Sequence, residues 1–390
     1  MDCDELGDWL RLAMTPQVGK GAARRLLAAF GLPHRIFQAD PSSLRDVVTP
    51  AQIQALRSVP AGLADHIKAT AQWLAAGGGC RRVLTLADSE YPAALLHAED
   101  PPLLLYAMGA TAAPGRLHWP ESIAIVGSRN PTAQGALNAR QFAASFARAG
   151  WAVVSGMALG VDAAAHEGAL EGADPAAGAM ATIAVVGTGL DRVYPQQHEA
   201  LARRIAARGL ILSELPLGAP PLADHFPRRN RILCALSRGT LVVEAAMRSG
   251  SLITARFAAE QGREVFPIPG SIHSAQSRGC HALIKQGAKL VETAQDVMEE
   301  LLPAGAGPDA IGSLVPSPHP THPTPTTPCA PSGDDDPLLR ALGYDPASLD
   351  ALSARTGLPT PQLQARLLEL ELQGQVARLP GGMFQRVASA

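Results

Sequence analysis

Residues 122–162 read SIAIVGSRNPTAQGALNARQFAASFARAGWAVVSGMALGVD. Two short apolar runs, 123–127 and 152–155, flank a stretch of helical composition at 134–149. Continuous apolar runs of this length are typical of strands that are buried on both faces, and a crossover helix between two such strands makes them parallel. The stretch therefore predicts a strand, a helix and a second strand parallel to the first.

The same alternation continues along the chain as far as residue 291. It predicts further strands at 182–187, 210–213, 240–244, 264–268 and 289–291, and further helices at 162–172, 197–208, 228–237, 251–262 and 280–286. Strands and helices in alternation form a parallel sheet with helices on both faces. We therefore expect an α/β fold, a doubly wound Rossmann-like sheet, with its ligand at the carboxyl ends of the strands.

Smaller segments flank the predicted sheet. Residues 1–80 read as short helices, and the glycine-containing turn at 15–21 suits a SAM-like or helix-hairpin-helix-like domain, although a plain helical turn explains it equally well. Residues 303–336 contain nine prolines and four glycines, which predicts a linker. Residues 337–390 predict two helices and a hairpin, the pattern of a winged helix. The expected domains are thus 1–80, 81–302 and 337–390.

Composition limits the class of protein. The 390 residues carry a net charge of −2, so the chain as a whole is not a basic nucleic-acid binder. None of its five cysteines forms a C-x-x-C pair, which argues against a zinc site or a disulfide framework, and we expect no metal and no cofactor. No signal-peptide pattern and no apolar run of membrane-spanning length is present, so we expect a cytoplasmic protein without membrane attachment.

Four loops after predicted strands are rich in Gly, Ser or Arg. Glycine lets a backbone approach an anion closely, and a helix start behind the loop offers free N–H groups. Together these loops predict a surface for phosphates. The candidate residues are Gly127, Ser128, Arg129, Ser155, Gly156, Phe226, Arg228, Arg229, Asn230, Arg231, Ser249, Gly250, Ser251, Thr254 and Lys285.

Local charge supports an anion site in this region. Residues 226–280 contain eight arginines and three acidic residues, a local excess of five positive charges. An arginine-rich helix is often only a solvated face. Arg228, Arg229 and Arg231 crowd one predicted helix start, however, where they oppose the helix dipole unless an anion binds there. Phe226 beside them either stacks on unpaired bases or packs in the core.

Enzymatic alternatives have weaker signals. The loop at 127–131 lacks the G-x-G-x-x-G fingerprint of a dinucleotide site, and the chain has no Walker sequence. Ser155, Asp162, His166 and Glu244 could meet at the strand ends, although Asp162 and His166 are better explained as residues of the first turns of one helix. No recognisable catalytic constellation results, so we expect no catalytic residues.

The run from Ile125 to Val291 resembles the DNA-processing protein A family (DprA, also called Smf). The resemblance rests on the order and spacing of seven motifs. They lie at 126–129, 155–162, 187–195, 226–232, 249–255, 269–270 and 283–288. His281 stands where many members have Asn, and the helical N-terminal segment and the C-terminal winged helix also resemble the family.

The resemblance implies a function. Members of this family bind single-stranded DNA without sequence specificity, load the RecA recombinase onto it, act in natural transformation and recombination, form homodimers and have no established enzymatic activity. By resemblance, Arg129 and the loop 226–231 would face DNA, and Ser249–Ser251 would hold a phosphate. The sequence predicts Arg129 and Arg229 at the protein surface.

Two other functions remain open from sequence. One is a Rossmann-like nucleotide phosphoribohydrolase of the lysine-decarboxylase-like group, because residues 237–244 keep Gly-Thr and a later Glu of its motif but lack Pro-Gly-Gly. The other is a protein-interaction scaffold in which the winged helix is the working part. Residues 334–390 hold seven acids and five arginines, so we expect this domain to contact protein and to be dispensable for DNA binding.

Overall fold

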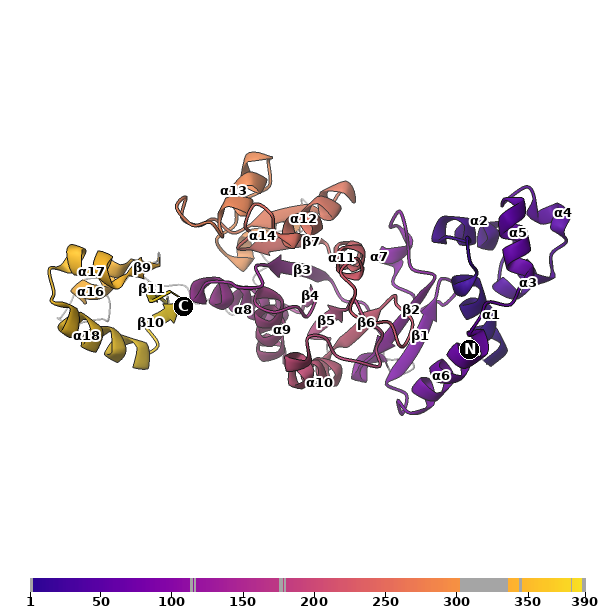
Figure 1. Cartoon of the computed structure of the whole chain (residues 1–390), viewed down its shortest axis with the longest axis horizontal. Coiled ribbons are helices and arrows are strands. Elements are labelled where there is room, and N and C mark those ends of the chain that lie inside the picture. Colours follow the sequence, from indigo (N-terminus) through magenta and orange to yellow (C-terminus); the bar gives the residue numbers. More distant parts are fainter. Residues whose placement is uncertain are drawn as a thin grey trace.

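The computed structural model describes residues 3–112, 115, 117–174, 178, 180–301, 336–343, 346–379 and 381–387. An eight-stranded sheet forms its centre, in the order β1-β2-β6-β5-β4-β3-β7-β8 (Figure 1). The strands are β1 (Arg81–Thr85), β2 (Leu104–Met108), β3 (Ser122–Gly127), β4 (Ala152–Ser155), β5 (Thr182–Val185), β6 (Leu210–Ser213), β7 (Gly239–Val243) and β8 (Glu264–Pro267).

Strands β3 to β8 are mutually parallel, and helices cover both faces of the sheet. Helices α8, α9 and α10 pack on one face, and α11 and α12 on the other (Figure 1). The helices of this domain are α7 (Ala93–Leu96), α8 (Ala133–Arg148), α9 (Val161–Gly172), α10 (Glu199–Arg208), α11 (His225–Leu236), α12 (Gly250–Glu260), α13 (Arg278–Lys285) and α14 (Ala294–Leu301), with 3₁₀ turns η1 (Ala110–Ala112) and η3 (Gln196–His198). The predicted doubly wound α/β fold is confirmed.

One predicted strand is wrong and two strands were missed. Residues 289–291 form no strand, because Val291 makes only one long backbone bond, to the Pro267 carbonyl at 3.4 Å. The other edge of the sheet is extended instead by β1 and β2, which pair antiparallel with each other, while β2 pairs antiparallel with β6. Two arginines at the start of β1 and two prolines before β2 hide this pair from a search for continuous apolar runs.

Six helices precede the sheet. They are α1 (Cys3–Met14), α2 (Lys20–Phe30), α3 (Pro33–Gln38), α4 (Pro41–Leu44), α5 (Pro50–Arg57) and α6 (Leu63–Ala75). Trp9 of α1 and Trp73 of α6 are buried in one cluster with Val83 and Tyr106 of the β1–β2 pair. The N-terminal helices therefore share a hydrophobic core with the edge of the sheet.

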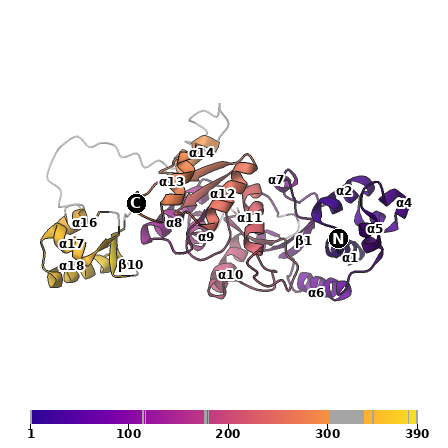
Figure 2. The same cartoon turned by 45° about the horizontal axis from the view of Figure 1, so that its top comes forward.

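The C-terminal module contains α16 (Pro337–Leu342), β9 (Ala347–Ser348), α17 (Leu349–Thr356), α18 (Thr360–Leu372), β10 (Val376–Leu379) and β11 (Met383–Arg386). Leu363, Leu367 and Leu370 of α18 are buried in its core, as their helical spacing predicts. Asp336, placed in the linker by sequence, caps α16, and the remainder of the predicted linker lies outside the described residues. The N-terminal helices, the sheet and this module lie in a row (Figures 1 and 2).

Candidate nucleic-acid interface

A cavity of about 740 Å³ opens at the carboxyl ends of β3 and β7. β3 is flanked by β4 on one side and β7 on the other, so the strand order changes direction here, as at the ligand sites of other doubly wound sheets. Loops after both strands and the first turns of α11 and α12 line the cavity. Of the candidate residues, those lining it are Gly127, Ser128, Arg129, Phe226, Arg229, Asn230, Ser249, Gly250, Ser251 and Thr254.

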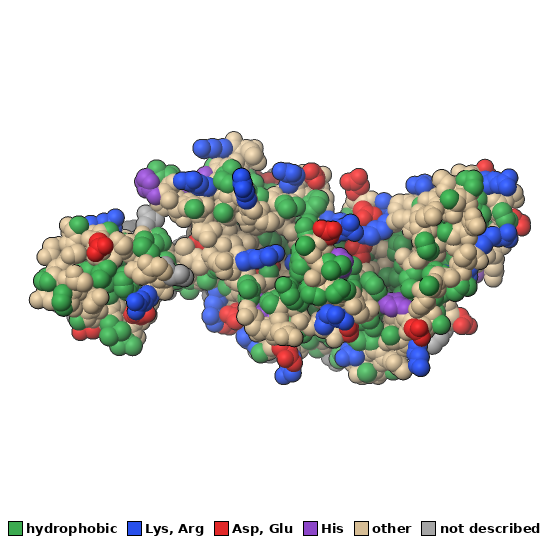
Figure 3. Space-filling model, in the orientation of Figure 1, with side chains coloured by type: hydrophobic (Ala, Val, Ile, Leu, Met, Phe, Trp, Pro, Cys, Tyr) green, Lys and Arg blue, Asp and Glu red, His purple; other side chains and the backbone are tan. Residues whose placement is uncertain are grey.

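Basic side chains are exposed on this part of the molecular surface. Figure 3 shows blue Lys and Arg groups over α11, α12 and α13, and others over the N-terminal helices and the C-terminal module. Within the cavity itself, Arg129 follows β3 and Arg248 follows β7, and both side chains are exposed. Two guanidinium groups therefore reach solvent from the two strands that flank the change of direction.

The start of α12 lies between these arginines. Ser249 is the N-cap, and its hydroxyl accepts a hydrogen bond from the Ser251 N–H at 3.3 Å. Gly250 is exposed and lines the cavity with both serines. A capped helix start with a glycine and two hydroxyls on the cavity side favours the binding of an anion.

An aromatic pair forms another wall. Phe226, at the start of α11, is half-buried, and its ring centroid lies 5.7 Å from that of Tyr194 at an interplanar angle of 41°. Tyr194 is 46% exposed. A Cβ atom at Gly187 would lie only 3.1 Å from the Phe226 ring, so the absence of a side chain at Gly187 leaves room for the ring. Phe226 is thus part of the cavity wall, and its ring packs near Tyr194 and Gly187.

Arg229 lies at the floor of the cavity and is only 7% exposed, so the expectation of a surface side chain is wrong. Its Nη1 donates to the Val185 carbonyl at 2.6 Å, and its Nε has no partner among the described residues. A Cβ atom at Gly156 would lie 1.7 Å from Nη1, which explains why glycine is needed there. Burial lowers the pKa of Arg229 to about 10.

Asp162 also lines the floor. Its Oδ2 accepts hydrogen bonds from the Gly156 and Ala158 N–H groups, at 3.1 and 3.2 Å. Burial raises the pKa of this carboxyl, while the nearby Arg229 and the two N–H groups act in the opposite direction. One oxygen therefore fixes the loop after β4, and the side chain brings a negative charge close to the arginine.

The suggested catalytic residues have structural partners. Ser155 is fully buried and donates to the Ile125 carbonyl at 2.7 Å. His166 is fully buried beside the Thr182 hydroxyl, 2.7 Å from Nδ1, and burial lowers its pKa to about 3. At working pH this imidazole is neutral and shielded from solvent, so these two side chains do not act on a ligand in the cavity.

Glu244 is occupied as well. Its backbone has a φ of +54°, and its carboxylate accepts hydrogen bonds from the Thr132 N–H, at 2.8 Å, and from the Thr132 hydroxyl, at 2.5 Å. Thr132 is the N-cap of α8, so the carboxylate fills the start of that helix. This placement explains the Glu of the hydrolase-like run at 237–244 as a structural residue.

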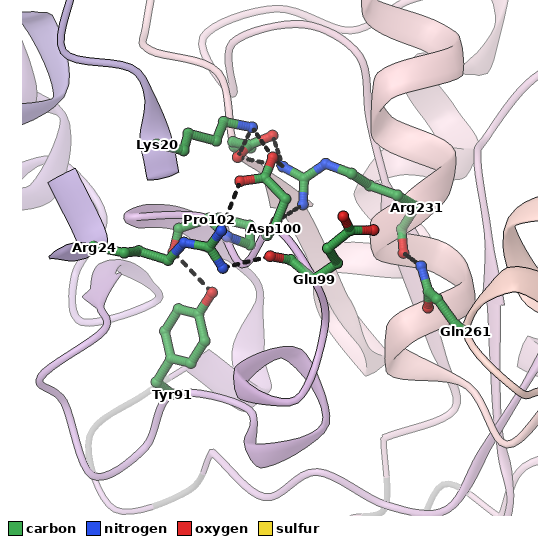
Figure 4. Close-up of polar contacts among 9 residues, drawn as sticks. Lys20, Arg24, Tyr91, Glu99, Asp100, Pro102, Arg231 and Gln261 are labelled. Atoms are coloured by element: carbon green, nitrogen blue, oxygen red, sulfur yellow. Dashed lines mark hydrogen bonds and ion pairs between the residues drawn. The ribbon is translucent and has the colours of Figure 1, made fainter. Parts of the chain in front are cut away.

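Arg231 turns away from the cavity and joins the N-terminal helices to α11 (Figure 4). It forms a two-oxygen ion pair with Glu214, with distances of 2.6 and 2.5 Å, and lies 3.8 Å from Asp100. Lys20 of α2 contacts Glu214 at 2.6 Å and Asp100 at 3.4 Å. Arg231 was predicted to contact DNA, but its side chain is engaged in this interdomain ion-pair network.

The remaining candidates lie outside the cavity. Arg228 is exposed on α11 and Lys285 on α13, and neither lines the cavity. Ser155 and Gly156 lie behind the floor. The sequence reasoning missed Arg248, Tyr194 and Gln276 as cavity residues. Arg248 had a usable signal, because it directly precedes the Ser249–Ser251 loop, whereas Gln276 comes from a loop without any distinguishing motif.

Membrane-spanning helices and metal sites are both missing from the part of the chain that the structure describes. None of the helices in the described ranges is long and apolar enough to cross a membrane. Within the same ranges, no group of three or more His, Cys, Asp or Glu side chains could hold a metal ion. The predicted linker also contains two histidines, His319 and His322, but these lie outside the described residues and so outside this statement.

Comparison with known proteins gives the family. Residues 82–302 match the model of DNA recombination-mediator protein A, and residues 322–382 match that of the DprA winged helix domain. Protein Smf of Escherichia coli (strain K12) is 42% identical over 311 residues, 76% of this chain and 75% of that protein.

Two further matches, one by sequence and one by structure, are to DprA of Streptococcus pneumoniae. The DNA processing protein DprA of strain R6 is 45% identical over 216 residues, which cover 55% of this chain and 73% of the relative. The X-ray structure of DNA processing protein A (DprA) from this organism aligns with a TM-score of 0.62 and 34% identity over 77% of this chain and 98% of that one. The chain belongs to the DNA recombination-mediator protein A family.

Proposed function

We propose that this protein binds single-stranded DNA in the cavity at the carboxyl ends of β3 and β7. The observation that carries the proposal is the combination of exposed arginines, a capped helix start and an aromatic wall around one opening. Arginines neutralise phosphates and release counterions. Aromatic rings stack on any unpaired base, which is a sequence-tolerant interaction.

A preference for single strands follows from the aromatic wall. The face of the Phe226 ring can stack only on a base that has left a duplex, because paired bases are already stacked on their neighbours. Tyr194 lies next to the Phe226 ring, with the two ring centroids 5.7 Å apart. Stacking contributes about 1–3 kcal/mol per base, so this wall is expected to discriminate single strands from duplex by roughly tenfold or more.

We further propose the biological setting that the family implies. In this proposal the protein is cytoplasmic, forms homodimers, acts by binding rather than by catalysis, and loads the RecA recombinase onto single strands during natural transformation and recombination. The name of one relative, DNA processing protein DprA, and the description of the matching family, DNA recombination-mediator protein A, support a role in DNA processing and recombination. Residues 81–302 would carry the DNA site, and the linker 303–336 would tether a winged helix that contacts protein.

The decisive experiment measures binding of the full-length protein to a labelled oligonucleotide, single-stranded or annealed, over a range of salt concentrations. If about five phosphates are neutralised, log K for the single strand should fall with log salt at a slope of about −3.5. The Phe226→Leu variant should lose about tenfold in affinity for the single strand and little for the duplex. Equal affinity for both forms in the wild type, or a flat salt response, would overturn the proposal.

A further inference from the structure

A second cavity, of about 550 Å³, lies at the other end of the sheet from the candidate DNA site, and we call it the amino-end cavity. Its lining includes Ser122, the first residue of β3, whereas Gly127, the last residue of that strand, lines the DNA site. Arg238 and Arg263 directly precede β7 and β8 and line it as well. No described residue lines both cavities, so this is a separate site at the amino ends of the strands.

Part of the wall of the amino-end cavity is aromatic and apolar. Its apolar lining residues include Tyr91, Pro92, Leu117, Trp119 and Pro120. The Trp119 Nε1 donates to the Glu90 carbonyl at 2.9 Å, and the Tyr91 hydroxyl donates to the Pro102 carbonyl at 2.8 Å. Because the donor of each ring already has a partner, the two rings offer a ligand mainly carbon surface.

The charged groups of the amino-end cavity do not favour an anion. Two acids and two arginines line it, so they contribute no net charge. Arg238 lies 3.5 Å from Glu121. Arg263 donates at 3.4 Å to the Ala235 carbonyl in the last turn of α11, where it meets the negative end of the helix dipole. With its cations engaged in this way, the cavity suits an uncharged, apolar ligand better than a phosphate.

The end of α14 lies at the edge of this cavity. α14 ends at Leu301, and residues 302–335 lie outside the described residues. The Leu301 carbonyl accepts a hydrogen bond from Nη2 of Arg238 at 3.2 Å, and Arg238 lines the amino-end cavity. The segment that follows Leu301 therefore begins beside the cavity, and only a short loop has to close for it to bind there.

The sequence of that segment suits the cavity. Residues 302–320 read LPAGAGPDAIGSLVPSPHP, with five prolines, four Leu, Ile or Val residues and one acid. Proline-rich segments bind in aromatic-lined grooves, because they lose little conformational freedom on binding. A proline-rich segment with a single acid thus begins beside a cavity that has an aromatic wall and no net charge.

We propose that the amino-end cavity binds residues 302–320 of its own chain. The proposal goes beyond the proposed function and does not depend on it, because the DNA site lies at the carboxyl ends of the strands. Binding of this segment covers Trp119 and leaves residues 321–335 alone as the tether of the winged helix. The reach of that module is then set from the amino ends of the strands, away from the DNA site.

The first test compares the wild type with a full-length variant in which a Gly-Ser sequence of equal length replaces residues 302–320, called the Gly/Ser variant. A labelled synthetic peptide of residues 302–320 should bind the Gly/Ser variant. It should bind the wild type at least about tenfold more weakly, because the tethered segment competes at an effective concentration of about 1 mM. Fluorescence anisotropy measures both affinities, and a peptide of the same composition in scrambled order serves as the control.

The matched substitutions are Trp119→Leu and Trp151→Leu, each made in the Gly/Ser variant. Loss of an aromatic anchor typically weakens binding by about tenfold or more, so Trp119→Leu should reduce the affinity for the peptide by that factor. Trp151 is also half-buried but does not line the amino-end cavity. Its replacement should leave the affinity for the peptide unchanged.

The second test leaves every described residue in place. Hydroxyl-radical labelling read by mass spectrometry compares the reactivity of Trp119 in the wild type and in the Gly/Ser variant. Trp119 should react several-fold more slowly in the wild type, and Trp151 should react equally in both chains. The protection should not change with protein concentration, because the segment belongs to the same chain.

Each opposite result would overturn the proposal. Equal affinity of the two chains for the peptide, or equal reactivity of Trp119, would mean that the wild-type cavity is open. Equal binding of the scrambled peptide would mean unspecific apolar contact, and protection that rises with protein concentration would assign the segment to a second copy. If Trp119→Leu unfolds, the labelling experiment still decides. Single-strand affinity should be the same in the wild type and the Gly/Ser variant, so failure of the DNA proposal leaves this test intact.

Discussion

Helix α11 was expected to face DNA and the domain of helix α18 to contact protein, and in the structure the two helices present different surfaces. The first turns of α11 place Phe226, Arg229 and Asn230 on a cavity. α18, the second helix of the winged helix, turns its leucine stripe inward and exposes Leu368 at 56% and Leu372 at 81% beside two glutamates. One helix start thus belongs to a polar concave site, whereas the other helix presents an apolar and acidic face.

The comparison also shows that the charge of a segment does not locate its contacts. Three arginines crowd the start of α11, but only Arg229 reaches the cavity, and it does so at the buried floor. The exposed guanidinium groups at the cavity opening, which we call the rim, come instead from Arg129 and Arg248 in the loops after β3 and β7. Three changes test this assignment of contacts. They are substitutions of the exposed arginines, substitution of Arg231 and removal of the winged helix, in decreasing order of the expected effect.

The double variant Arg129→Ala/Arg248→Ala should weaken single-strand binding by about 100-fold at low salt. Each hydrogen-bonded contact between charged groups contributes about 1.5–3 kcal/mol, and tenfold corresponds to about 1.4 kcal/mol. The slope of log K against log salt should become shallower by about 1.4, because two counterions fewer are released. Titrations at several salt concentrations measure both quantities.

Arg203→Ala serves as the control for that double variant. Arg203 is exposed on α10, where it pairs with Glu199 of the same helix at 2.5 Å, and it does not line the cavity. Its removal should change neither affinity nor slope by more than about twofold. An equal loss in the control would mean that DNA responds to overall charge and that the rim has no special role.

Arg231→Leu should mainly affect folding. The substitution removes one of the two cationic partners of Glu214 at the junction with the N-terminal helices, where Lys20 is the other (Figure 4). A cavity of about 160 Å³ lies next to this junction. Loss of a partly buried ion pair is expected to cost about 1–3 kcal/mol of the free energy of unfolding. Thermal denaturation measures the loss, and single-strand affinity of the folded variant should stay within about threefold.

Arg228→Leu is the control for Arg231→Leu. Arg228 is exposed on the same helix, so its loss should change the free energy of unfolding by less than about 0.5 kcal/mol. If Arg231→Leu instead kept full stability and abolished binding, the side chain would have to leave its ion pair and contact DNA.

Removal of the winged helix should have the smallest effect. α18 carries one arginine, Arg366, which is paired with Asp336 and Glu369, together with a half-buried Glu371 and exposed leucines. Its surface therefore offers no free positive charge to a phosphate backbone. Cleavage within 303–336 should change single-strand affinity by less than about threefold. A loss beyond tenfold, in a fragment that is still folded and has kept its oligomeric state, would show that this module touches DNA.

The sequence predicted the parallel part of the sheet well because its strands are continuous apolar runs. β3, β4 and β7 are buried on both faces, which leaves a pattern that polar loops interrupt clearly. The antiparallel pair β1–β2 was missed because β1 begins with Arg81 and Arg82, so that it contains no continuous apolar run.

The positions of the arginines could not be predicted from their order along the chain. Successive residues of an α-helix are about 100° apart, so Arg228, Arg229 and Arg231 point in three directions. Which direction meets solvent, floor or N-terminal helices depends on packing between distant segments. Asp162 was interpreted as a residue of the first turn of a helix, which is correct, but its place at the cavity floor required the fold.

The filled start of α8 has a consequence for the polarity of a bound strand. Two helix starts follow the strands beside the cavity, and Glu244 neutralises that of α8 while that of α12 remains exposed. A surface with one attractive and one neutralised end has a direction, and so does a polynucleotide, whose 5′ and 3′ ends differ. Such a surface is expected to hold a strand in one orientation. Any process that continues along the bound strand would then run toward the same end each time.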